Sequence, residues 1–218
     1  MSAFRTLPAA LVVAALAACG GEPPAEEAAQ AEVQAAAETA RAPSPCYIAG
    51  GTPEEALTRP SPLAQAAFAL AGAEGTLCYG APSVKGRKIM GELVPFGEPW
   101  RLGANEATAF HLTAATEIGG VVLQPGTYSF YAIPGETEWT FVLNSAADRW
   151  GIPIDESVRA TDVGSFAAKP EATEAPVETL AFRFEAASGG TAGEFVMEWE
   201  STRVRIPVRP ARASAPAM

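Results

Sequence analysis

The chain has 218 residues with 15 basic and 25 acidic side chains, a formal net charge of -10, and 48% hydrophobic but only 8% aromatic residues. This length fits one domain with additional segments, and the acidic balance argues against nucleic acid as a partner, since phosphate binding needs a basic surface. The longest apolar run, from Leu7 to Ala18, is too short to span roughly 30 Å of hydrocarbon, so a helical membrane protein is not predicted.

Residues 1–18 have the pattern of a targeting segment. Arg5 precedes an apolar stretch that ends in Leu16-Ala17-Ala18-Cys19. This run resembles the lipobox of bacterial lipoprotein signal peptides, which implies cleavage before Cys19 and acylation of Cys19. Several acyl chains, at about 0.8 kcal/mol per buried methylene, anchor a protein stably. Two alternatives stay open at this stage, an ordinary secretory signal with an incidental cysteine and a soluble apolar N-terminus.

The resemblance to a lipobox also implies a location. A lipid on Cys19 makes the membrane a partner and places the protein in the cell envelope. Gly20, rather than Asp, follows the cysteine. In a Gram-negative cell this implies the outer membrane, with the protein facing the periplasm or the cell surface.

Residues 19–58 are predicted to be an acidic tether rich in Ala, Glu and Pro. Seven Glu and a single basic residue, Arg41, lie between Gly20 and Glu55. Such a segment buries too little apolar surface to offset the entropy of ordering it. A flexible chain of this length has a mean reach of about 35 Å from the membrane. Residues 1–58 carry two basic and seven acidic side chains, so half of the net charge lies outside the predicted domain.

Two cysteines remain once Cys19 is acylated. An even number in an oxidising compartment predicts a disulfide between Cys46 and Cys78. Closing a loop of this length is worth about 3.5 to 4 kcal/mol by the chain-entropy estimate. The alternative is a pair of free or buried thiols.

The hydrophobic pattern from residue 59 to 209 has a period of two, which predicts half-buried antiparallel strands. Gly- and Pro-containing turns separate these segments, and residues 210–218 are predicted to be a disordered tail. Eight or more short strands indicate an all-β fold, an antiparallel β-sandwich, of which a jelly roll is one arrangement. The expected strands lie at residues 66–70, 76–80, 108–113, 128–132, 139–143, 180–184, 195–199 and 204–208.

One stretch of this domain resembles a bacterial family known as domain of unknown function 2911. The resemblance is carried by residues 83–87, by Gly91–Gly97 and above all by the run Trp-Arg-Leu-Gly-Ala-Asn-Glu at 100–106. It continues through Gly126–Ser129 and Glu198–Glu200, and covers nearly the whole predicted domain. The resemblance implies no established activity.

The candidate ligand-binding residues are Lys85, Arg87, Arg101, Asn105 and Glu106, which stand among glycines. Arg and Asn offer a fixed donor geometry for a carboxylate, a phosphate or a sugar hydroxyl, and loops at the mouth of a sandwich are plausible ligand sites. The alternative is structural: an ion pair between Arg101 and Glu106 that pins two sheet edges, with Asn105 capping a turn. An enzymatic alternative is an envelope hydrolase that uses Glu106 with Arg87 or Arg101.

We expect neither a metal site nor a cofactor. His111 is the only histidine, and the alternation of its strand predicts an exposed position without partners for a metal. Glu198 and Glu200 are expected on an exposed charged face, although together with Glu106 they leave a paired-carboxylate glycosidase open. Arginines near the C-terminus are expected to meet these acids across a hairpin, namely Arg203, Arg205, Arg209 and Arg212.

No set of catalytic residues is recognisable, because the sequence has no Gly-x-Ser-x-Gly elbow and no paired metal ligands. The sequence therefore predicts a membrane-anchored lipoprotein whose β-sandwich binds a small molecule, a glycan or an envelope partner without catalysis.

Overall fold

The structure, a computed structural model, describes residues 46–211. Cys19, residues 19–45 of the predicted tether and the end of the predicted tail lie outside these residues. The described part contains ten strands and two short helices, α2 (Pro53–Thr58) and α3 (Glu156–Arg159). None of its helices has the length and apolar character needed to cross a membrane.

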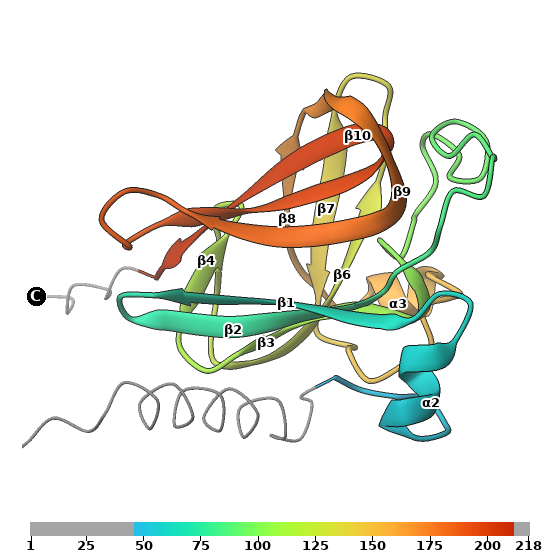
Figure 1. Cartoon of the computed structure of the whole chain (residues 1–218). Coiled ribbons are helices and arrows are strands. Elements are labelled where there is room, and N and C mark those ends of the chain that lie inside the picture. Colours follow the sequence, from blue (N-terminus) through green and yellow to red (C-terminus); the bar gives the residue numbers. More distant parts are fainter. Residues whose placement is uncertain (1–45, 212–218) are drawn as a thin grey trace, which may run out of the picture. The chain divides into compact units, whose positions relative to one another are not determined.

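Two antiparallel sheets face each other, as Figure 1 shows, so the predicted β-sandwich is confirmed. Neighbouring strands are mostly consecutive in the chain, an order closer to a meander than to the interleaved order of a jelly roll. In spatial order, the six-stranded sheet consists of β1 (Leu63–Leu70), β2 (Ala73–Gly80), β3 (Ala104–Leu112), β6 (Gly126–Ile133), β7 (Trp139–Asn144) and β8 (Asp162–Ala168). The four-stranded sheet consists of β5 (Val121–Leu123), β4 (Thr116–Ile118), β10 (Gly193–Pro210) and β9 (Pro170–Ala186).

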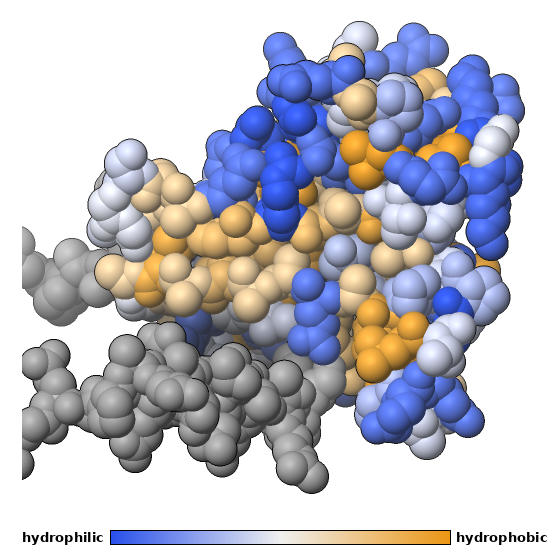
Figure 2. All heavy atoms as spheres, viewed as in Figure 1, coloured by the Kyte–Doolittle hydropathy of each residue, from blue (hydrophilic) through white to orange (hydrophobic). Residues whose placement is uncertain are grey.

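The core lies between the two sheets and is built by the alternation that the sequence predicts. Phe110 and Phe130 face inward from the six-stranded sheet, and Phe195 faces them from β10; none is more than 1% exposed. The ring centroids of Phe110 and Phe195 are 5.4 Å apart, so the two sheets meet through aromatic contacts. Outward positions are more polar, and Figure 2 shows hydrophilic residues gathered over the four-stranded sheet.

The strands differ from the prediction in two ways, since two expected strands are merged and three observed strands were not expected. The strands expected at 195–199 and 204–208 are one continuous strand, β10, which has register shifts on both sides of Glu200. Glu200 has φ 55°, so the irregularity interrupts the alternation without ending the strand. The sequence reasoning also missed β4 and β5, which have three residues each, and β8, whose small residues give a weak apolar signal.

The segment from residue 46 to 58, which we assigned to the tether, is folded. The expected disulfide joins Cys46 to Cys78 on β2, with a Cα–Cα distance of 5.6 Å. The helix α2 begins with a capping box, in which Thr52 and Glu55 satisfy each other's backbone N–H groups. Covalent attachment and local capping therefore order a stretch whose composition alone predicts disorder.

Candidate functional site

The five predicted ligand residues lie in two separate groups. Lys85 and Arg87 lie in the loop that runs along β9, and both are exposed. The Lys85 backbone N–H donates to the Glu178 carboxylate at 2.9 Å. The Arg87 guanidinium donates to the carbonyls of Ser83 and Val84 in its own loop. These contacts fasten the loop to β9 and to itself.

Arg101, Asn105 and Glu106 lie at the start of β3, next to the folded segment that precedes β1. Asn105 has φ 64° and donates its side-chain N–H to the Ser61 carbonyl at 2.8 Å. Glu106 pairs with Arg59, not with Arg101: one terminal nitrogen of Arg59 lies 2.8 and 2.9 Å from the two carboxylate oxygens. The structural alternative, an ion pair between Arg101 and Glu106, is therefore wrong, because the Glu106 carboxylate pairs with Arg59, the residue that follows α2.

Glu106 is unsuited to act as a general acid. Burial raises the pKa of its carboxyl, but hydrogen bonds from Arg59 and from the Ala49 N–H outweigh burial and leave the pKa below its usual value. The carboxylate is therefore ionised at neutral pH, and both oxygens are occupied. Since the side chain is only 9% exposed, this geometry argues against a hydrolase built on Glu106.

Arg101 differs from Lys85 and Arg87, which also form no ion pair among the described residues, because its side chain is half-buried. The guanidinium is half-buried and donates from Nε to the Gly103 carbonyl at 3.1 Å. No carboxylate of the described residues lies within ion-pair distance of it, and burial lowers the pKa of the Arg101 guanidinium. Its stem packs on Gly151, where an added Cβ would lie 2.4 Å from the Arg101 Cδ.

A second half-buried arginine, Arg149, lies two positions before Gly151 and also contacts it. It donates to the carbonyls of Ala146, Trp150 and Gly151 at 3.0 to 3.2 Å. Burial lowers the pKa of Arg149 as well, and within residues 46–211 no carboxylate forms an ion pair with it. Both arginines therefore contact Gly151 without an ion pair among the described residues, although the charges of Asp155 and Asp162 act on Arg149 and partly offset the effect of burial on its pKa.

The loop that carries Arg149 joins β7 to β8 and is held against β3. The Gly151 N–H donates to the Asn105 carbonyl at 2.8 Å, and the Ala107 N–H donates to the Arg149 carbonyl at 3.1 Å. Next to these contacts, Trp150 is 45% exposed and Ile152 is 54% exposed. We call Arg101, Arg149, Gly151 and Trp150 the Gly151 site.

The sequence reasoning missed Arg149 and Trp150. The available signal was a Trp followed by Gly in a long loop between two strands, where binding residues are common. Arg101 was predicted as a ligand residue, but its expected partners were residues close to it in the sequence. Its neighbours in the structure, Arg149 and Trp150, lie more than forty positions later in the chain.

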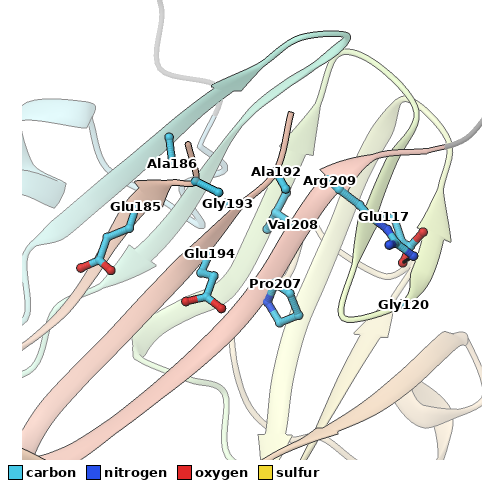
Figure 3. A pocket seen from close by; sticks show the side chains of 11 residues that line it. Glu117, Gly120, Glu185, Ala186, Ala192, Gly193, Glu194, Pro207, Val208 and Arg209 are labelled. Atoms are coloured by element: carbon cyan, nitrogen blue, oxygen red, sulfur yellow. Dashed lines mark ion pairs between the residues drawn. The ribbon is translucent and has the colours of Figure 1, made fainter. Parts of the chain in front are cut away.

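The outer face of the four-stranded sheet carries a groove of about 560 Å³, drawn in Figure 3. Three glutamates line it, and each already has an arginine partner: Glu117 pairs with Arg209, and Arg205 lies 3.1 and 3.2 Å from Glu185 and Glu194. Because each of these glutamates already forms an ion pair, the groove offers no unpaired glutamate to a charged ligand.

The predicted charged face is present around Glu198, but not around Glu200. Glu198 pairs with Arg183 and Arg203, so one of the expected arginines meets it. Glu200 instead accepts a hydrogen bond from the Ile89 N–H at 3.4 Å. The two carboxylates thus serve different partners, which argues against a paired-carboxylate glycosidase at this place.

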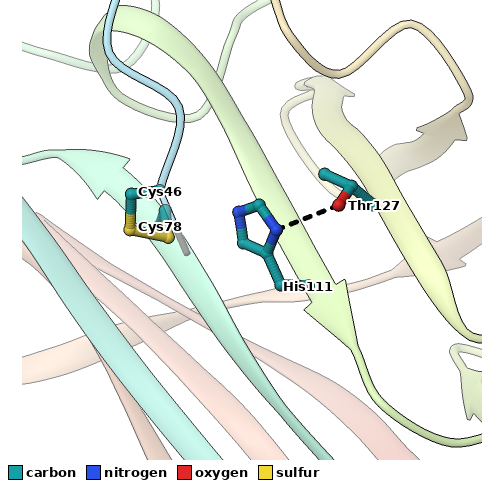
Figure 4. Close-up of a disulfide and its surroundings, with 4 residues drawn as sticks. All are labelled: Cys46, Cys78, His111 and Thr127. Atoms are coloured by element: carbon teal, nitrogen blue, oxygen red, sulfur yellow. Dashed lines mark hydrogen bonds between the residues drawn. A yellow bond between two sulfur atoms is a disulfide. The ribbon is translucent and has the colours of Figure 1, made fainter. Parts of the chain in front are cut away.

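His111 is not the exposed residue that the alternation predicted. It is half-buried, and its Nδ1 lies 3.0 Å from the Thr127 hydroxyl, as Figure 4 shows. Its neighbours on this outer face, Ala109 and Ser129, are 5% and 1% exposed, so the face is covered here. Burial lowers the pKa of His111, while the charge of Asp148 opposes this. In the described part of the chain, no three His, Cys, Asp or Glu residues are grouped to hold a metal ion.

The fold and these sites define a β-sandwich domain with several surface ion pairs and with two half-buried arginines at Gly151 that form no ion pair among residues 46–211. A family model described as Protein of unknown function (DUF2911) matches residues 61–208. The match spans β1 to most of β10, and the chain belongs to this family. No curated protein and no solved structure matches the chain.

Proposed function

We propose that this protein is a lipid-anchored protein of the cell envelope whose β-sandwich binds, without catalysis, a small molecule or glycan that carries a carboxylate or phosphate group. The proposed binding place is the Gly151 site. The observation that carries the proposal is the presence of two half-buried arginines, Arg101 and Arg149, that form no ion pair in the described residues.

The physical argument starts from the cost of an unbalanced charge. Removing a cation from water is unfavourable unless an opposite charge or hydrogen bonds compensate. Among residues 46–211, Arg101 donates one hydrogen bond out of the five that a guanidinium offers. A carboxylate or phosphate accepts two parallel hydrogen bonds from such a group, which gives both affinity and orientation.

The exposed Trp150 ring supports the same assignment. An aromatic ring beside arginine is typical of binding surfaces, because the ring offers apolar area at a low cost in conformational entropy. Gly151 supports it too, since any larger residue there would collide with Arg101 and with the backbone of β3. The site is thus pre-formed by backbone contacts between β3 and the β7–β8 loop.

The anchoring part of the proposal rests on the sequence before the described residues. The run that ends in Cys19 supports lipid attachment, and residues 20–45 would separate the domain from the membrane. The disulfide between Cys46 and Cys78 fits an oxidising compartment such as the cell envelope.

The binding proposal is tested by titrating the full-length protein in detergent with inorganic phosphate, glucuronate and short sugar phosphates, followed by calorimetry. We expect Arg101→Met to weaken binding roughly tenfold or more, because a charge-assisted hydrogen bond is lost. Arg87→Met is the matched control, since Arg87 is exposed and contacts only its own loop. Equal affinity of Arg101→Met and the wild type, or no binding of any anion by the wild type, would refute the site.

The anchoring proposal has its own test. Cells that express the wild-type protein are fed a fatty acid with a clickable label, and Cys19→Ala is compared with it. We expect label on the wild-type protein only, and the wild-type protein in the membrane fraction. Label on the Cys19→Ala protein, or an unlabelled wild type, contradicts acylation at Cys19.

A further inference from the structure

A second candidate site lies on the outer face of the six-stranded sheet, where its lining shares no residue with the Gly151 site, although the charge of Asp162 acts on Arg149. Two hollows, of about 370 and 750 Å³, occur there. The smaller lies over β6, β7 and β8, and the larger lies beside α3. Both are lined by Arg159 and Asp162, so they adjoin at these two side chains. We call the two hollows together the Asp162 trough.

Two buried side chains hold the Asp162 carboxylate in place. The Tyr131 hydroxyl donates to Oδ2 at 2.8 Å, and the Asn144 amide donates to Oδ1 at 2.8 Å. Tyr131 is 1% exposed and Asn144 is fully buried, whereas Asp162 itself is exposed. Burial and the hydrogen bond to Asp162 raise the pKa of Tyr131 to about 12, so the hydroxyl remains a donor at neutral pH. Buried residues thus orient an acceptor toward open space.

Arg159 is the donor that faces the same space. It is the last residue of α3, it is exposed, and no carboxylate within residues 46–211 forms an ion pair with it. This distinguishes the trough from the groove on the other sheet, where each lining glutamate already has an arginine. The Arg159 guanidinium and the Asp162 carboxylate, which line both hollows, can therefore form hydrogen bonds with a ligand.

The remaining lining mixes hydroxyls with apolar surface. Thr140 and Ser165 contribute exposed hydroxyls to the smaller hollow, and the neighbouring Val163 is 44% exposed. Ile133 adds further apolar surface on the same face. A sugar ring has matching chemistry, since it presents hydroxyl groups at its edge and C–H groups on its faces.

We propose that the Asp162 trough binds a neutral saccharide. Asp162 accepts hydrogen bonds from sugar hydroxyls and Arg159 donates to sugar oxygens. The apolar side chains of Ile133 and Val163 pack against the C–H face of the ring. Four carboxylates and one arginine line the larger hollow, so an acidic sugar is disfavoured there. The trough and the Gly151 site thus select ligands of different charge, and the two proposals rest on different side chains.

The test titrates the full-length protein in detergent with glucose, N-acetylglucosamine, their disaccharides, glucuronate and glucosamine, read out by calorimetry and saturation-transfer NMR. We expect a neutral sugar to bind and Asp162→Asn to weaken its binding roughly tenfold or more. Glu171→Gln makes the same chemical change on an exposed carboxylate of the other sheet and should leave affinity unchanged. Arg101→Met should leave it unchanged too, which separates this site from the Gly151 site.

Because Asp162 is part of a hydrogen-bond network, Asp162→Asn is first checked for an unchanged circular dichroism spectrum. Arg159→Ala and Ser165→Val provide a second test at positions that are exposed, and each should weaken the same sugar. The proposal is overturned by any of three results: no neutral sugar binds the wild type, only glucosamine or glucuronate binds, or these trough variants bind as the wild type does.

Discussion

Glu106→Gln isolates the contact that fastens the segment before β1 to the sandwich. The substitution keeps the size of the side chain but removes its negative charge and one of the two oxygens that accept hydrogen bonds from Arg59. Removing one partner of a buried ion pair costs 3 to 5 kcal/mol. The Glu106 side chain is 9% exposed and that of Arg59 is 23% exposed, so solvent screening places the expected loss near the lower end, at about 3 kcal/mol.

The assay is equilibrium unfolding in urea, together with a thermal melt. For a domain of this size, a loss of about 3 kcal/mol corresponds to a fall in Tm of roughly 6 to 12 °C. Glu92→Gln is the matched control, because Glu92 pairs with Lys88 while both side chains are more than 60% exposed. We expect this control to lose less than about 0.5 kcal/mol.

The pH dependence gives the same contact a second signature. The folded-state pKa of Glu106 lies below its usual value of 4.5, so its contribution is complete above pH 4.5 and is lost as the pH falls through the folded-state pKa. The stability difference between the wild type and Glu106→Gln should therefore shrink in acid. A double-mutant cycle with Arg59→Met should give a coupling energy above about 1 kcal/mol; coupling near zero, or a Glu106→Gln protein as stable as the wild type, refutes the reasoning.

Three further predictions concern other described contacts. Reducing the bond between Cys46 and Cys78 should lower the free energy of unfolding by about 3.5 to 4 kcal/mol, and an unchanged urea midpoint would contradict this. Because burial lowers the pKa of His111 below 6.5, its contribution to stability is complete above pH 6.5 and is lost in acid; His111→Gln should flatten the pH dependence of Tm below that value, and an identical profile would contradict it. Gly151→Ala should weaken anion binding and lower Tm, since the new Cβ would lie 2.4 Å from the Arg101 Cδ; wild-type affinity and Tm in a calorimetric test would show that this close packing does not matter.

The sequence predicts the fold well, because the fold depends on a pattern that is local. Alternation at Phe110, Phe130 and Phe195 places these rings on inward faces, and the structure finds them in one core. The disulfide was also predictable, since only two cysteines remain after Cys19. The short strands β4 and β5 were not predictable, because three residues carry too little periodic signal.

The sites were harder to predict, because their residues meet through tertiary contacts. The partner of Glu106 is Arg59, which is 47 positions away and belongs to a segment whose composition predicts disorder. Arg149 lies in an irregular loop, and Asp162 begins β8, an edge strand with several small residues. Neither segment shows a clear hydrophobic periodicity in the sequence. Arg101 was identified by its residue type, but its lack of an acidic partner is visible only in the structure.

We propose that the sandwich binds an organic anion through Arg101 and Arg149 at Gly151. The most direct measurement is a calorimetric titration of the full-length protein with glucuronate and a sugar phosphate, carried out in parallel on the wild type, Arg101→Met and Arg87→Met. The account predicts saturable binding by the wild type and Arg87→Met and a roughly tenfold or greater loss in Arg101→Met. Equal binding by all three proteins, or no binding by the wild type, would contradict it.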